Sequence, residues 1–379
     1  MLKDVHLSLM IGPIVPIPAT RVVMEHLDSI EVTVKDKGPS AFQISFGLSN
    51  KSPLQILFLL SGGKPLLFMR VVIVVTLSGR SEVIMDGVIT HHQIKPGSNG
   101  SQSTLTITGE DLTALMNQQD FSGFPFPATP AEARVLLLLA KYAILGVLPM
   151  VIPSILVDVP LPTGNIPGQR GTDLAYINAL ADRVGYVFYI DPGPKPGMNV
   201  AYWGPQIKIG IPQPALNVDM DAHTNVESLS FQFDNQKNKI PTVFIYNELT
   251  KVVFPIPLPP ITPLNPPLGL VPPLPTSIGD LKPVRDDLSK RSIPQAIMIG
   301  LATAAKWAEA VTGSGELNVL RYGRVLKARQ LVGVRGAGPA FDGLHYVTGV
   351  THKIKRGEYK QSFELSRNGL ISTIPKVMP

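Results

Sequence analysis

The chain has 379 residues, 44% of them hydrophobic and only 16% charged, which is enough for two or three domains with buried cores and excludes a largely disordered protein. Its formal net charge is +6, and the basic clusters lack the interleaved aromatic residues of a single-strand nucleic-acid binder, so no specific nucleic acid is expected as a partner. The chain contains no cysteine, which excludes disulfides, thiolate metal sites and cysteine nucleophiles and fits folding in a reducing cytoplasm.

Residues 1–115 predict a first antiparallel β-barrel. Polar and apolar residues alternate over residues 29–34, 41–46 and 104–108, as they do in strands that bury one face. Residues 70–76 are rich in valine, which indicates a central strand covered on both faces. Asp86-Gly87 lies between two such runs and predicts a hairpin turn.

Residues 116–212 predict a mixed α/β domain. A helix is expected to start at Thr129-Pro130, where the spacing to Glu132 is that of a capping box. A second helix is expected to start at Thr172 and to end at Gly185, with a strand after it over residues 186–190.

Residues 213–254 and 313–379 predict a second barrel that an insertion splits. Alternation is clearest over residues 346–354 and 359–366, and Arg356-Gly357 between them predicts a tight turn. The chain is therefore expected to be mainly β with α+β parts, built on two similar barrels. We expect this duplication to suit an assembly part better than an enzyme.

Residues 255–312 form the predicted insertion, a proline-rich arm followed by a helix. Residues 255–275 contain ten prolines, which cannot pair in a central strand. A stiff spacer explains the prolines, but an arm that docks on a neighbour explains the apolar residues better; these are Ile256, Leu258, Ile261, Leu264, Leu268 and Leu270. The helix is expected to start at Ser292 and to end at Gly313 and Gly315.

No catalytic, cofactor-binding or metal-binding residue can be predicted. The seven histidines form no HExxH pattern, and neither a GxSxG elbow nor a phosphate loop is present. Asp219 and Asp221 have a spacing that is common by chance and gives only weak support for calcium. The long apolar stretches are broken by glycine, proline or arginine, so stable membrane insertion is not expected.

Three segments resemble the late control protein D family of phages, the baseplate hub of contractile tails, which is similar to the hub part of VgrG. They are VIMDGVITHHQI with STLTITGEDL, TDLAYINALADRVGYVFYI, and RYGRVLKARQLVGVRGAG with DGLHYVTGVTHKIKRGEYKQSFELSRNGL. The order of the segments along the chain gives the resemblance its weight, because each motif alone is a common strand or turn.

The resemblance implies a non-enzymatic hub that forms a homotrimer with pseudo-sixfold symmetry, joining an inner tube protein to a spike protein beside baseplate wedge or other tail proteins. It also implies assembly in the bacterial cytoplasm and a place in the baseplate of a phage tail or contractile injection particle. Asp86-Gly87, Asp342-Gly343 and Arg356-Gly357 carry over as barrel turns, and Tyr322, Arg324 and Arg335 as parts of the second barrel that could lie at an interface. The chain ends at Pro379 without a needle, so a separate spike is expected.

The alternative from another class is a cell-wall hydrolase or a carbohydrate-binding module carried by the same particle. A hydrolase needs a carboxylate pair in a cleft, and a sugar binder needs exposed aromatic side chains. Aromatic residues make up only 7% of the chain, which disfavours the second role.

Overall fold

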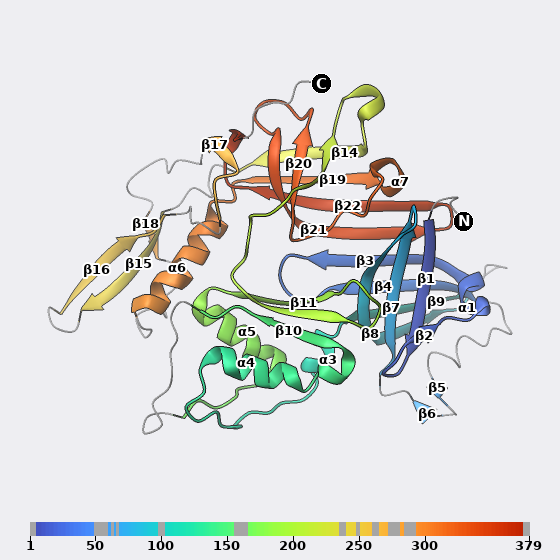
Figure 1. The fold of residues 1–379 in the computed structure, drawn as a ribbon, viewed down its shortest axis with the longest axis horizontal. Coiled ribbons are helices and arrows are strands. Elements are labelled where there is room, and N and C mark those ends of the chain that lie inside the picture. The colour runs from blue at the N-terminus through green and yellow to red at the C-terminus, as the bar shows by residue number, and fades with distance from the viewer. Residues whose placement is uncertain are drawn as a thin grey trace.

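The computed structural model describes residues 5–48, 60–61, 64–65, 68–97, 103–154, 166–234, 240–247, 251–259, 265–271, 281–283 and 293–373. It is mainly β with few helices, as predicted, and it contains one large sheet and several small sheets (Figure 1).

The N-terminal part of the large sheet has the strand order β2-β1-β7-β8-β9-β4-β3, and every pairing in it is antiparallel. Short helix α1 (Arg21–His26) precedes β3, and the small strands β5 (Leu60–Ser61) and β6 (Lys64–Pro65) pair with each other outside this sheet. The large-sheet strands are β1 (Val5–Gly12), β2 (Ile17–Pro18), β3 (Leu27–Lys35), β4 (Ala41–Leu48), β7 (Arg70–Leu77), β8 (Arg80–Lys95) and β9 (Ser103–Asp111).

The C-terminal part of the same sheet has the order β13-β20-β21-β22-β19-β14. Its strands are β13 (Gln213–Asn217), β14 (Val226–Phe233), β19 (Val311–Asn318), β20 (Leu331–Arg335), β21 (Gly343–Lys355) and β22 (Glu358–Arg367). One-turn helices η2 (Asp221–His223) and α7 (Val319–Tyr322) lie between these strands.

The two parts are joined edge to edge, because β21 pairs with β3 over residues 349–355. The prediction of two closed barrels needs correction at this point. In the described residues strand pairing runs from β14 to β2 without returning to its start, so neither part closes on itself. The physical reason is that β21 is long enough to pair with β20 and β3 along one edge, which gives the strands of the second part a partner in the first.

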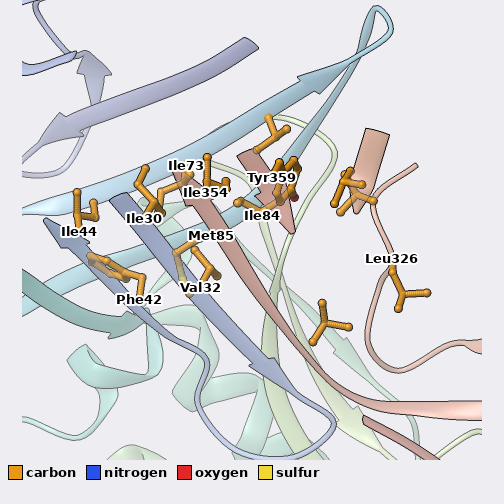
Figure 2. Packing of buried hydrophobic residues seen from close by; sticks show 14 of the residues in the cluster. Ile30, Val32, Phe42, Ile44, Ile73, Ile84, Met85, Leu326, Ile354 and Tyr359 are labelled. Atoms are coloured by element: carbon orange, nitrogen blue, oxygen red, sulfur yellow. The ribbon is translucent and has the colours of Figure 1, made fainter. Parts of the chain in front are cut away.

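One hydrophobic cluster lies under both parts of the sheet. It joins Ile30 and Phe42 of the N-terminal strands to Ile354 and Tyr359 of the C-terminal strands, all of them buried. Figure 2 shows these side chains, together with Ile73 and Met85, packed among strands from the two ends of the chain. The two predicted barrels therefore share one core.

The mixed segment after β9 packs two helices against a small sheet of order β10-β12-β11. Thr172 caps α5 by accepting a hydrogen bond from the Ala175 N–H, and Gly185 ends this helix in the left-handed conformation, as predicted. The elements are α3 (Thr113–Met116), α4 (Ala131–Ala140), η1 (Ala143–Leu145), β10 (Val147–Val151), α5 (Asp173–Val184), β11 (Val187–Pro192) and β12 (Asn199–Gly204).

Strand β15 (Ile240–Asn247), which the predicted bounds placed in the second barrel, forms a hairpin with β16 (Val252–Pro257), and this hairpin lies outside the large sheet and packs on helix α6 (Ile293–Trp307). We therefore count the insertion from β15 rather than from residue 255, and it projects from one end of the large sheet (Figure 1). Strand β18 (Leu281–Pro283) extends the hairpin, and β17 (Gly269–Val271) pairs with β23 (Leu370–Ser372) near the C-terminus. Gly313 and Gly315 do not end the helix; they lie in β19, beneath the rings of Phe231 and Phe363.

Candidate assembly interface

The large sheet contains the same five-strand unit twice. Strands β7-β8-β9-β4-β3 of the first copy and β20-β21-β22-β19-β14 of the second have the same chain order, spatial order and antiparallel pairing. The flanking strands differ, since β1 pairs with β7 antiparallel whereas β13 pairs with β20 parallel. The predicted duplication is therefore present as a repeated unit within one sheet.

The two copies have β-bulges at matching positions in two of their strand pairs. Strands β3 and β4 have a bulge between Leu27 and Ser29, and β14 and β19 have one between Val226 and Ser228. Strands β8 and β9 have a bulge after Ile89, and β21 and β22 have one after Val347. Because a bulge fixes the register of a strand pair, these positions align the copies residue by residue.

A hydrogen bond gives an independent check of this alignment. The Ile89 N–H donates to the Met69 carbonyl at 2.9 Å, and at the matching place the Val347 N–H donates to the Gln330 carbonyl at 2.9 Å.

The internal seam between β21 and β3 places Thr351 opposite Thr33 and His352 opposite Val32. The Thr33 and Thr351 hydroxyls are 3.1 Å apart on one face of the sheet. On the other face His352 is buried, and its Nδ1 lies 2.8 Å from the Tyr359 hydroxyl. Burial lowers the pKa of His352 to about 3, so this ring is neutral in the folded protein at ordinary pH.

The face of the sheet opposite the core is polar across both copies. Small hydroxyl residues alternate with charges there, and Glu316 lies 3.3 Å from Lys353 and 3.5 Å from Lys360. Desolvation alone would raise the pKa of Glu316, but the hydrogen bond from Lys353 and the charges of Lys353 and Lys360 together outweigh it and lower the pKa. A shallow depression crosses this face over residues that include Thr33, Ser228, Ser230, Ser314, Thr351 and Ser362.

Several strands of the large sheet have an edge with no strand partner in the described part of the chain; besides β2 and β13, these are β14 and the outer part of β8. Strand β14 pairs with β19 on one side only. Strand β8 pairs with β7 up to Val88, and beyond it β9 is the only described strand that pairs with residues 91–95, which are exposed. Exposed edges of this kind are sites for pairing with another chain.

The predicted turns lie in different settings. Asp86-Gly87 does not form a turn but lies within β8, where the Asp86 carboxylate binds Arg70 and the Asn199 amide. A glycine is needed at 87 because a Cβ would lie 2.2 Å from the Glu110 carbonyl oxygen of β9. Asp342-Gly343 lies where the loop after β20 enters β21, and Arg356-Gly357 separates β21 from β22, with φ +82° at Gly357.

Some of the apolar arm residues pack within this chain and one of them is exposed to solvent. Ile256 and Leu258 pack against α6, and Leu268 packs against Leu331 and Tyr346, whereas Leu270 is exposed. Ile261 and Leu264 lie outside the described residues. The hairpin instead exposes apolar residues that were not singled out from the sequence, namely Phe244, Val252, Val253 and Phe254.

The three remaining predicted interface residues also have clear positions. Tyr322 ends helix α7 rather than lying in a strand, and its buried hydroxyl donates to the Pro214 carbonyl at 2.6 Å. Arg324 and Arg335 are exposed.

Within the described ranges, no group of three or more histidine or acidic side chains could hold a metal ion. No described helix combines the length and the apolar character that crossing a membrane requires.

Solved structures that are similar to this chain include tail proteins and a chain of a VgrG complex. The tail protein from Neisseria meningitidis MC58 aligns over 97% of this chain and 98% of its own, with a TM-score of 0.59 and 16% identity. The 43 kDa tail protein of prophage MuSo2 from Shewanella oneidensis aligns over 96% of this chain and 98% of its own, with a TM-score of 0.59 and 12% identity. A chain of the half-lidded Francisella PdpA–VgrG complex aligns over 100% of this chain and 60% of its own, with a TM-score of 0.60 and 11% identity.

The sequence matches no family model and no curated protein. At these identities the structural likeness shows the fold. The fold is that of phage tail and VgrG-complex proteins, in agreement with the hub family that the sequence resembles.

Proposed function

We propose that the chain is the structural hub of a contractile injection machine. Three copies form a ring that joins a sixfold inner tube to a threefold spike. The observation that carries this proposal is the repeated five-strand unit in one continuous sheet. Because three two-unit chains present six similar units, one kind of subunit can meet both symmetries. The fold shared with tail proteins supports the same role.

The two ends of the sheet differ, and this difference suggests which partner binds at which end. The mixed segment leaves after Asp111 and the insertion leaves after Phe233, and the strand register puts both at the end of the sheet where β3 finishes at Lys35. These two additions occur once per chain, so in a trimer they are threefold. We assign this end to the spike and to neighbouring baseplate wedge proteins, and the opposite end, with the Arg356-Gly357 turn, to the inner tube.

The proposed protein binds and positions other proteins and has no catalytic step. It would be assembled in the bacterial cytoplasm and become part of a phage tail or contractile injection particle.

Light scattering on the purified chain, alone and with the tube and spike proteins encoded beside it, tests the proposal. The expected result is a mass of three times 40.9 kDa and a complex with each partner. A monomer that binds neither partner and releases sugars from peptidoglycan would refute the hub and favour the cell-wall hydrolase.

A further inference from the structure

We infer that the ring closes by strand pairing: the outer edge of β14 in one copy of this chain pairs antiparallel with residues 91–95 of β8 in the next copy. This inference rests on the proposed trimer and names the surface that holds it together. Its basis is the internal seam, where β21 of the second unit accepts β3 of the first. By the register of the bulges, β8 is the counterpart of β21, and β14 is the counterpart of β3.

The register of the internal seam fixes the register of the proposed one. Thr351 lies opposite Thr33 in the internal seam, and their counterparts are Gln93 and Gln232. Lys353 lies opposite Glu31, and their counterparts are Lys95 and Ser230. Gln93 of one copy should therefore lie opposite Gln232 of the next, with Lys95 opposite Ser230.

The side chains on the core face suit this pairing. Ile94 is the counterpart of His352, which is 4% exposed in the internal seam, yet Ile94 itself is 38% exposed. Phe233, the counterpart of Val34, is also 38% exposed. In the proposed register Ile94 lies opposite Phe231 and Phe233 opposite His92, so pairing would bury two apolar side chains that the single chain leaves in water.

The polar face suits it as well. Gln93 and Lys95 are exposed on β8, and Ser230 and Gln232 are exposed on β14. Pairing would continue the hydroxyl-rich and charged face of the internal seam from one copy to the next. The contact joins two different surfaces of the chain, and such head-to-tail contacts close into a ring in which the outer edge of β14 and the edge of residues 91–95 are both paired.

Cysteine pairs test the register directly, because the natural chain has no cysteine. Gln93→Cys with Gln232→Cys should give disulfide-linked dimers and trimers under mild oxidation, seen on a non-reducing gel. Thr33→Cys with Thr351→Cys is the matched internal control and should link only within one chain. Gln93→Cys with Ser228→Cys is the off-register control, since four residues along a strand separate the pair by about 13 Å, beyond disulfide reach.

The outcomes test the proposed strand pairing separately from the proposed trimer. Linked trimers from the 93/232 pair alone, with native mass under reducing conditions, support the inference. A trimer by light scattering in which the 93/232 pair does not link overturns the seam and leaves the proposed hub standing. Equal linking of the 93/232 and 93/228 pairs, which indicates random collision, also overturns it. A monomer under all conditions overturns both proposals.

Discussion

Arg70 and Leu331 occupy the same place in the two copies of the unit, and they attach different parts of the protein. In the first copy Arg70 binds Asp86 at 2.7 Å and donates to the Leu145 carbonyl at 2.8 Å, so a buried ion pair fastens the mixed segment to the sheet. In the second copy Leu331 packs with Tyr346 and Leu344 against Leu268 of the insertion, so an apolar cluster fastens that segment.

This difference shows that the pairing of the strands and the attachment of the added segments are under different structural constraints. Strand order, pairing register and the bulges of β3 with β4 and of β8 with β9 agree between the copies, which pair edge to edge through β21 and β3. The side chains that hold the added segments do not agree. The sheet therefore preserves the feature that the proposed pseudo-sixfold ring needs, and the attachments would supply the threefold features of that ring.

Breaking the buried ion pair of the first copy is expected to have the largest effect, which is on the stability of the chain. Asp86→Ala leaves the buried Arg70 and Asn199 side chains without their shared carboxylate, and should lower the free energy of unfolding by about 3–5 kcal/mol. Denaturant unfolding measures this loss. The double variant Arg70→Leu with Asp86→Leu imitates the apolar second copy and should lose less. A loss below about 1 kcal/mol for Asp86→Ala would contradict the role of this network.

The exposed hairpin of the insertion gives the next largest effect. Phe254→Ser removes an exposed apolar side chain from the end of the sheet assigned to the spike, and should weaken spike binding by about tenfold or more with little change in thermal stability. Titration calorimetry with the spike protein measures the affinity. Val22→Ser, at a similarly exposed position of α1 at the opposite end of the sheet, is the matched control. Unchanged affinity for Phe254→Ser would show that the hairpin does not contact the spike.

Acid should lower the stability of the folded chain through two buried histidines of β21. Burial lowers the pKa of His352 to about 3, and burial together with the nearby Arg367 charge lowers the pKa of His345 to about 3. The unfolded value is near 6.5, so the stability is complete above about pH 6.5 and falls as the pH is lowered toward 3, by up to about 1.4 kcal/mol per pH unit for each histidine.

Thermal melts between pH 7 and 5 measure this slope. His352→Leu should flatten it, although the variant loses stability overall because the Tyr359 hydroxyl loses its partner. His6→Gln changes an exposed histidine of β1 and should leave the slope as it is. An equal slope in the wild type and in His352→Leu would contradict the burial argument.

The smallest effect belongs to the proposed seam between copies. Ser230→Lys puts a like charge opposite Lys95, and Ser230→Glu recreates the Lys353 and Glu31 arrangement of the internal seam. Lysine should weaken and glutamate should strengthen each contact by about 0.2–1 kcal/mol. Sedimentation at several concentrations compares the two variants. The same direction of change in both would argue against this register.

Local patterns predicted much of the fold. Helix α5 has its cap at Thr172 and its stop at Gly185, and β21 and β22 alternate cleanly around Arg356-Gly357. Asp86-Gly87 was mistaken for a turn because its dipeptide is typical of hairpins, whereas its position depends on Arg70 in a neighbouring strand. Nothing local reveals that β3 pairs with β21, since Thr33 and Thr351 are 318 residues apart in the sequence.

Glycine has a second role that depends on neighbouring strands and not on the local sequence. Gly313 and Gly315 looked like the end of a helix, but they make room for the aromatic rings of Phe231 and Phe363, which lie on neighbouring strands. The open edges of β8 and β14 could not be found from sequence either, because an edge is defined only by which strands pair.

Electron microscopy of the purified chain tests the central claim most directly. Averaged images viewed along the ring axis should show six similar lobes, with three projections at alternate positions. A label attached to the insertion should lie on these projections. Mass photometry of the same particles should give three chains for each ring. A ring with six projections and six chains, or isolated particles of one chain, would contradict the account.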